Sequence, residues 1–163
     1  MEVYNTCVRC CLLYFEAGGG QNGCVGDKRK PMFKSVYIID DDEVSAFLTE
    51  AMLAAEHFAR KYDTFLNPQD ALQHLLPLLQ QDQRRSIPDV IFLDLNMPYV
   101  DGWQFLDTLA PHAPLIKCSC MLYMLTSSLD FNDVRRAQKY DFLAGFLQKP
   151  IEEETIRDLL HKA

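Results

Sequence analysis

The chain has 163 residues, 48% hydrophobic and 24% charged, a balance typical of one folded domain and too apolar for an intrinsically disordered protein. Its net charge of −7 disfavours direct binding to nucleic acids, because an acidic protein repels phosphate backbones. No apolar run approaches the roughly 20 residues that a membrane-spanning helix needs, so we expect neither nucleic-acid binding nor membrane insertion.

Residues 1–31 differ in character from the rest of the chain. Four of the six cysteines fall here: Cys7, Cys10, Cys11 and Cys24. Their spacing lacks the two separated pairs typical of a structural zinc site. Glu2 and Arg9 interrupt the start that a secretory signal would need. We therefore expect an N-terminal extension that is either flexible or non-native, with Met32 as an alternative start of translation.

From Met32 onward, strand and helix patterns alternate along the chain. We expect strands over residues 35–39, 60–66, 89–95, 115–125 and 144–147. We expect helices over residues 43–58, 68–79, 103–109, 130–140 and 152–161. The apolar residues that give the first helix its spacing are Val44, Phe47, Leu48, Ala51, Met52 and Ala55.

Two details of the second half of the chain add to this pattern. Cys118 and Cys120 lie two residues apart within the fourth expected strand, which would place both on one face of that strand as small apolar side chains. Ser128 or Asp130 is suited to cap the helix that follows.

Five strand-and-helix units in strict alternation predict an α/β fold for residues 32–163. The expected architecture is a doubly wound, five-stranded parallel sheet with helices on both faces. The nearly continuous apolar strands agree, since parallel strands are buried on both sides. In such sheets, ligands bind at the carboxyl ends of the strands, so the residues at those ends are the candidates for function.

The expected strand ends carry an unusual concentration of charged and polar residues. The first strand ends in Asp40-Asp41-Asp42, the third in Asp94, the fourth in Thr126 and the fifth in Lys149. Several carboxylates at one sheet edge repel one another, and Mg²⁺, which prefers oxygen ligands, would relieve that repulsion. A carboxylate nucleophile, a metal, a cation and a hydroxyl donor are together the parts needed to form an aspartyl phosphate.

Each of these residues also has a purely structural interpretation. Residues 40–42 are acids at the start of a helix, where negative charge is favoured, and this interpretation is strongest for Asp42. Lys149 would then be a surface lysine and Phe146 a core residue. The histidines, His57, His74, His112 and His161, have no metal-site or catalytic spacing, and we expect them at the surface.

Residues 33–163 resemble the receiver domain of two-component response regulators, in its stand-alone form. The motifs that carry the resemblance are residues 36–39 followed by Asp40-Asp41, residues 93–98 followed by Asp101-Gly102, residues 125–127, and residues 146–150. Four separated motifs in the right order are far more specific than any one alone. The resemblance implies a flavodoxin-like receiver fold.

The resemblance also implies a role for each motif residue. Asp94 would accept the phosphoryl group and take part in the Mg²⁺ site. Asp41 would bind Mg²⁺ directly, Asp40 largely through water, and Asn96 through its backbone carbonyl. Thr126 would close on the phosphoryl group, and Lys149, followed by a cis peptide to Pro150, would bridge to it. Phe146 would be the switch aromatic whose rotamer follows Thr126.

The implied function is phosphoryl acceptance in a phosphorelay. The donor would be a sensor histidine kinase or a histidine phosphotransfer protein, the target an unknown protein, and the location cytoplasmic. Apart from its own phosphorylation and dephosphorylation, the protein would not be an enzyme. Two alternatives remain: a Mg²⁺-dependent phosphatase of the haloacid-dehalogenase type, and a binding module that works without phosphorylation. The phosphatase is disfavoured because Asn96 stands where a second acid would be required.

Overall fold

The computed structural model describes residues 33–98, 100–128 and 130–162, without the side chain of Lys162. The expected N-terminal extension, its cysteines and the alternative start at Met32 lie outside the described residues and stay predictions. Within the described part of the chain, no helix is long and apolar enough to cross a membrane.

A five-stranded parallel sheet forms the centre of the fold, with the strand order β2-β1-β3-β4-β5. The strands are β1 (Phe33–Ile39), β2 (Ala59–Phe65), β3 (Val90–Asp94), β4 (Met121–Thr126) and β5 (Leu143–Gln148). The chain passes from β1 outward to β2 and then returns to β3 on the other side of β1. This reversal places the carboxyl ends of β1 and β3 next to each other, where a ligand site is expected in open α/β sheets.

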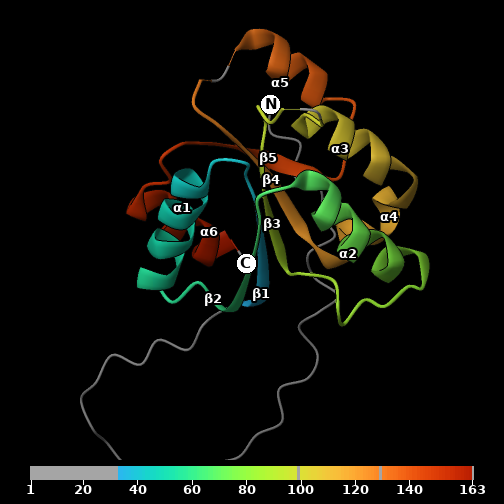
Figure 1. The fold of residues 1–163 in the computed structure, drawn as a ribbon, viewed down its shortest axis with the longest axis horizontal. Coiled ribbons are helices and arrows are strands. Elements are labelled where there is room, and N and C mark those ends of the chain that lie inside the picture. The colour runs from blue at the N-terminus through green and yellow to red at the C-terminus, as the bar shows by residue number, and fades with distance from the viewer. Residues whose placement is uncertain (1–32, 99, 129, 163) are drawn as a thin grey trace, which may run out of the picture.

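Helices cover both faces of the sheet (Figure 1). They are α1 (Glu43–Ala55), α2 (Pro68–Gln80), α3 (Gly102–Leu109), the short 3-10 helix η2 (Ala110–His112), α4 (Ala113–Ser119), α5 (Phe131–Ala137) and α6 (Glu153–Lys162). In Figure 1, α1 and α6 lie on one side of the strands, and α2, α3 and α4 lie on the other. The predicted fold class is therefore confirmed.

The alternation of side chains along β1 divides the core into two layers. Val36 and Ile38 belong to the apolar cluster beneath α1 and α6, whereas Tyr37 and Ile39 belong to the cluster beneath the remaining helices. Successive side chains of a strand point to opposite faces, so a strand that is apolar at every position must be covered on both. This is why the run of residues 36–39 requires two layers of helices.

The segment before β4 contradicts the predicted strand over residues 115–125. Helix α4 occupies Ala113–Ser119, and β4 begins only at Met121. Cys118 is therefore an exposed helical residue, while Cys120 is buried at the end of that helix, and the prediction that both lie on one strand face is wrong. Pro114 indicates the start of this helix, because proline is well tolerated in the first turn of a helix. The apolar pattern of the surrounding residues predicts a strand instead.

Helix α1 also differs from its predicted form. It ends at Ala55 instead of continuing to residue 58, since His57 adopts a positive φ of 52° and turns the chain into β2. Its buried residues are Ala46, Thr49 and Leu53. The apolar residues that predict the helix lie instead on its exposed side: Val44, Phe47, Leu48, Ala51, Met52 and Ala55.

Candidate functional site

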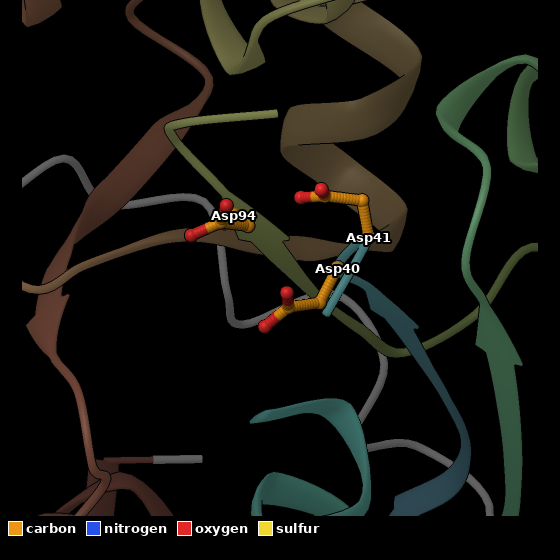
Figure 2. A group of neighbouring side chains, drawn as sticks. All are labelled: Asp40, Asp41 and Asp94. Atoms are coloured by element: carbon orange, nitrogen blue, oxygen red, sulfur yellow. The ribbon is translucent and has the colours of Figure 1, made fainter. Parts of the chain in front are cut away.

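Three carboxylates meet where β1 and β3 end. Oxygen atoms of Asp40, Asp41 and Asp94 all lie within 4.8 Å of one another, and Figure 2 shows the three side chains gathered around one space. Asp40 and Asp41 directly follow β1, and Asp94 is the last residue of β3. Because β1 and β3 are hydrogen-bonded neighbours, the sheet itself brings these acids together.

Asp40 is held firmly at the end of β1. It is buried, with 1% of its surface exposed, and its backbone N–H donates to the carbonyl of Phe65 at 3.1 Å. The Ser45 hydroxyl donates to Asp40 Oδ2 at 2.6 Å, and the backbone N–H of Asp42 donates to Oδ1 at 3.1 Å. These donors fix the orientation of a carboxylate that would otherwise be costly to bury.

Asp42 has a different role from its two neighbours. Its side chain caps α1 and accepts hydrogen bonds from the backbone N–H groups of Val44 and Ser45 at 2.9 and 3.2 Å. The structural interpretation of Asp42 as a helix-start residue is therefore confirmed. The cap also sets where α1 begins, and with it the position of Ser45 beside Asp40.

Asp94 is buried at the end of β3, with 6% of its surface exposed. Behind it, the backbone N–H of Gly102 donates to the carbonyl of Leu95 at 3.0 Å. A Cβ atom at position 102 would lie 2.8 Å from the Asp94 carbonyl oxygen and 2.7 Å from Met124 Cε. Any larger residue at position 102 would force the structure to shift, because the start of α3 passes directly against the backbone of Asp94.

Lys149 links two of the three acids. It follows the end of β5, and its peptide bond to Pro150 is cis, as the sequence resemblance implies. Its Nζ lies 2.6 Å from Asp40 Oδ2 and 2.6 Å from Asp94 Oδ1. The lysine side chain is 15% exposed, so its interior charge partly compensates the two buried carboxylates.

The electrostatics of the cluster follow from this arrangement. Burial raises the pKa of Asp94 above its ordinary value; the hydrogen bond and charge of Lys149 lower it, and the charges of Asp40 and Asp41 raise it further. Burial by itself would lower the pKa of Lys149, but hydrogen bonds to Asp40 and Asp94 and their charges together raise it. Lys149 is therefore a cation at neutral pH.

Thr126 and Phe146 lie near the cluster without joining it. Thr126 is buried, and its hydroxyl donates to the carbonyl oxygen of Ser128 at 2.7 Å. Phe146 is partly buried, with its ring against the edge of Trp103 at a centroid distance of 6.1 Å, and the guanidinium of Arg136 lies 4.8 Å from the centre of the Trp103 ring. Their switch roles stay predictions.

Asn96 is exposed between the buried residues Leu95 and Met97, and its part in metal binding is likewise untested. Two further residues support the site: Ser45, which belongs to none of the sequence motifs, and Gly102, which the sequence places only within the motif Asp101-Gly102. The signal for Ser45 was its place in the first turn after three acids, where a hydroxyl can reach back to a strand end. The contact of Gly102 with the Asp94 backbone is a tertiary feature that the motif does not contain.

Comparisons with known proteins identify the family. The sequence matches the family described as "Response regulator receiver domain" over residues 36–161. The chain belongs to this family. Receiver domains are signalling modules of two-component systems and not turnover enzymes. Phosphorylation on an aspartate is typical of the family. Its members bind Mg²⁺ through an acidic pocket and interact with histidine kinases.

Individual relatives agree with this assignment. The chain is 25% identical over 122 residues to the "Probable methanogenesis regulatory protein FilR2" of Methanothrix harundinacea. This match covers 75% of this chain and 76% of that protein. It resembles a two-component response regulator from Cytophaga hutchinsonii (27% identity, TM-score 0.70, 82% and 97% of the two chains). It also resembles a response regulator receiver protein from Dyadobacter fermentans, with 28% sequence identity and a TM-score of 0.67; the match covers 79% of this chain and 96% of that one.

Proposed function

We propose that this receiver domain accepts a phosphoryl group on Asp94 in a Mg²⁺-dependent reaction and thereby changes its contacts with other proteins. The donor would be a phosphohistidine on a sensor histidine kinase or a histidine phosphotransfer protein. In the transfer, a carboxylate oxygen of Asp94 forms the bond to phosphorus while the phosphorus–nitrogen bond breaks, and the imidazole nitrogen keeps the electron pair. The cytoplasmic location predicted from the resemblance belongs to the same proposal.

The observation that carries this proposal is the arrangement of charge around Asp94. Two other carboxylates and the Lys149 ammonium group lie at the end of the same sheet, within a few ångströms of its side chain. A purely structural site would not gather three acids around one lysine, because the uncompensated negative charge is costly. A phosphoryl-transfer site needs that arrangement, since it must hold both a nucleophile and a cation.

The donor set fits Mg²⁺. Asp40, Asp41 and Asp94 offer carboxylate oxygens, the hard ligands that this ion prefers, and the backbone carbonyl of Asn96 would be a fourth ligand. The bound ion would neutralise charge on the acids and on the phosphoryl oxygens. Ser45 keeps Asp40 oriented toward the cluster, and Lys149 supplies the second positive charge at Asp94.

Thr126 and Phe146 would convert phosphorylation into a change of shape. In the present structure, the Thr126 hydroxyl is engaged with the Ser128 carbonyl. To contact a phosphoryl group on Asp94, it must give up that hydrogen bond, which moves the segment leading into α5. Phe146 would follow with a new rotamer, and its contact with Trp103 would change.

The proposal is tested by incubating the protein with acetyl phosphate in the presence or absence of Mg²⁺ and measuring its intact mass. We expect a labile phosphate adduct that requires Mg²⁺, is missing from Asp94→Asn and is retained by Asp70→Asn. Asp70 is a suitable control because it is an exposed acid at the start of α2, so its substitution makes the same chemical change away from the site.

The other outcomes decide between the alternatives. Sustained hydrolysis of phosphate esters without a stable adduct would support the phosphatase. An Asp94→Asn protein that still forms the adduct would place the acceptor elsewhere. Absence of an adduct from the wild-type protein, with or without Mg²⁺, would contradict the proposal and support the phosphorylation-independent binding module.

A further inference from the structure

One oxygen of Asp40 is shared by two different donors. The Ser45 hydroxyl donates to Asp40 Oδ2 at 2.6 Å, and Lys149 Nζ lies 2.6 Å from the same oxygen. The other oxygen, Oδ1, accepts the backbone N–H of Asp42 at 3.1 Å. A neutral hydroxyl and a cation therefore hold the same carboxylate oxygen.

Asp40 depends strongly on these donors, because its side chain is 1% exposed. A buried carboxylate that loses a hydrogen-bond donor does not regain it freely from water. The bond from the Ser45 hydroxyl is charge-assisted, which makes it stronger than a hydrogen bond between neutral groups. Figure 2 shows the Asp40 carboxylate between Asp94 and the ribbon of α1, the helix that carries Ser45. The orientation of Asp40 is thus set from α1 as well as from Lys149.

Helix capping does not account for the Ser45 hydroxyl. A serine in the first turn of a helix commonly uses its side chain on nearby backbone groups. Here the Asp42 side chain has that role, and it accepts the backbone N–H groups of Val44 and of Ser45 itself. The Ser45 hydroxyl instead donates to Asp40, five positions earlier in the chain. The cap fixes the backbone of Ser45 and leaves its hydroxyl for Asp40.

The two donors respond differently to a metal ion among the three acids. Oxygens of Asp40, Asp41 and Asp94 lie within 4.8 Å of one another, and Lys149 lies against two of these acids. The Lys149 ammonium group is repelled by any divalent cation that these oxygens hold. The Ser45 hydroxyl is uncharged, so this repulsion does not act on it.

The proposed phosphorylation makes a similar demand on Lys149. To bridge to a phosphoryl group on Asp94, its ammonium group must turn toward that group and away from Asp40. Asp40 must meanwhile keep its place, because it belongs to the metal site. A second donor that does not move is then needed at Asp40 Oδ2, and Ser45 is in position to be that donor.

We propose that Ser45 is a positioning residue for the Mg²⁺ site: its hydroxyl holds Asp40 in place when Lys149 withdraws, and so strengthens the binding of Mg²⁺. Without the hydroxyl, Asp40 Oδ2 keeps Lys149 as its donor, and Mg²⁺ must displace that cation from a carboxylate that then has one donor fewer. This inference deepens the proposed function and rests on it, because it takes the three acids as the Mg²⁺ site that serves phosphorylation of Asp94.

The test uses three variants. Ser45→Ala removes the hydroxyl, and Ser45→Thr retains one on the same carbon atom. Thr64→Val is the matched control, because the Thr64 hydroxyl donates to Glu50 Oε2 at 2.7 Å in an exposed pair between β2 and α1. It removes the same kind of hydrogen bond, from hydroxyl to carboxylate, away from the three acids.

The first measurement is the binding of Mg²⁺ itself, by urea unfolding at increasing concentrations of MgCl₂. A ligand that binds the folded state raises the free energy of unfolding by an amount that gives its dissociation constant. We expect Ser45→Ala to raise the dissociation constant for Mg²⁺ about fivefold or more, and Ser45→Thr and Thr64→Val to leave it within about twofold of the wild-type value.

The second measurement is the rate of phosphorylation by acetyl phosphate as a function of Mg²⁺ concentration. In Ser45→Ala, the Mg²⁺ concentration that gives half of the maximal rate should rise by the same factor as the dissociation constant. The rate at saturating Mg²⁺ should stay within about twofold of the wild-type rate, because the hydroxyl acts on Asp40 and not on the nucleophile.

The inference is overturned if Ser45→Ala binds Mg²⁺ as tightly as the wild type, or if Ser45→Thr or Thr64→Val loses as much affinity. A loss of stability in metal-free buffer with unchanged Mg²⁺ affinity would overturn it as well, because Ser45 would then have only a structural role. So would a wild-type protein that Mg²⁺ does not stabilise.

The two measurements also separate this inference from the proposed function. If acetyl phosphate forms the Mg²⁺-dependent adduct and Ser45→Ala behaves as the wild type, the role of Ser45 fails while the acceptor site stands. If Mg²⁺ binding depends on Ser45 but the wild type forms no adduct, the proposed function fails while the role of Ser45 in metal binding stands.

Discussion

Two neighbouring regions depart from the rule that apolar side chains are buried and charged ones exposed. The acid cluster is formed by Asp40, Asp41 and Asp94. The outer side of α1, which we call the α1 stripe, is formed by Val44, Phe47, Leu48 and Met52. The cluster buries charged groups, with Asp40 exposed by 1% and Asp94 by 6%, whereas the stripe exposes Val44 and Phe47 by 67% each. The two regions are adjacent, because α1 starts immediately after the acids of β1. A domain selected only for stability would place apolar side chains inside and charges outside.

The two regions carry different costs. The buried acids are tolerated because Lys149, Ser45 and backbone N–H groups satisfy them, so their cost appears when one partner is removed. The α1 stripe has little cost in the folded monomer, because an exposed apolar side chain neither strains the fold nor leaves a polar group unpaired. The comparison therefore predicts large effects of substitutions on stability in the cluster and negligible ones in the stripe.

The largest expected effect is that of Lys149→Met. The substitution leaves Asp40 and Asp94 buried without their cation, and we expect it to lower the free energy of unfolding by about 4 kcal/mol. Urea denaturation in metal-free buffer measures the change. The control is Lys117→Met, which removes the exposed pair with Asp141, 2.9 Å apart, and should cost less than about 1 kcal/mol. Equal losses in the two variants would mean that the buried cluster has no special dependence on its cation.

Leucine-to-alanine substitutions on the two sides of α1 compare the stability contributions of its buried and exposed residues. Leu53 is 0% exposed and Leu48 is 51% exposed. We expect Leu53→Ala to lower the free energy of unfolding by about 3 kcal/mol, through lost burial and the cavity that remains. Leu48→Ala should change it by no more than about 0.5 kcal/mol. Thermal and urea unfolding check both values, and a comparable loss in Leu48→Ala would show that the stripe contributes to the fold.

A smaller effect is expected behind Asp94. Gly102→Ala places a methyl group 2.8 Å from the Asp94 carbonyl oxygen, so the backbone must shift. We expect a loss of about 2 kcal/mol in the free energy of unfolding and slower phosphorylation by acetyl phosphate, measured by urea unfolding and intact mass. Gly145→Ala separates close packing from backbone strain, since Gly145 has a φ of 156° but no neighbour closer than 4.0 Å. A Gly102→Ala protein with wild-type stability and rate would mean that the Asp94 backbone is free to move.

Much of the candidate site could be predicted from the sequence. Asp40, Asp41, Asp94 and Lys149 each follow a strand whose pattern is clear, and parallel strands bring their carboxyl ends to one edge. The position of such residues at this edge follows from the chain direction and the sheet type alone. Thr126 was likewise placed correctly at the end of β4, although the predicted start of that strand was wrong.

Other features depend on the packing of distant segments. Helix α1 has apolar residues around most of its circumference, so a periodic pattern indicates a helix without indicating which side meets the sheet. The run of residues 115–125 is apolar enough for either a strand or a buried helix, and its length alone did not separate α4 from β4. Contacts with the rest of the sheet determine where the helix ends and the strand begins in this segment.

The alternation of strands and helices, the parallel sheet and the residues at its carboxyl edge were predictable from the amino-acid sequence, because they follow from local periodicity and chain direction. The tertiary structure adds that Lys149 joins Asp40 to Asp94, that Gly102 lies against the Asp94 backbone, and that Val44, Phe47, Leu48 and Met52 of α1 face outward. The physical reason is that hydrogen bonds, ion pairs and burial depend on direction and distance between segments far apart in the chain, which a residue pattern does not contain.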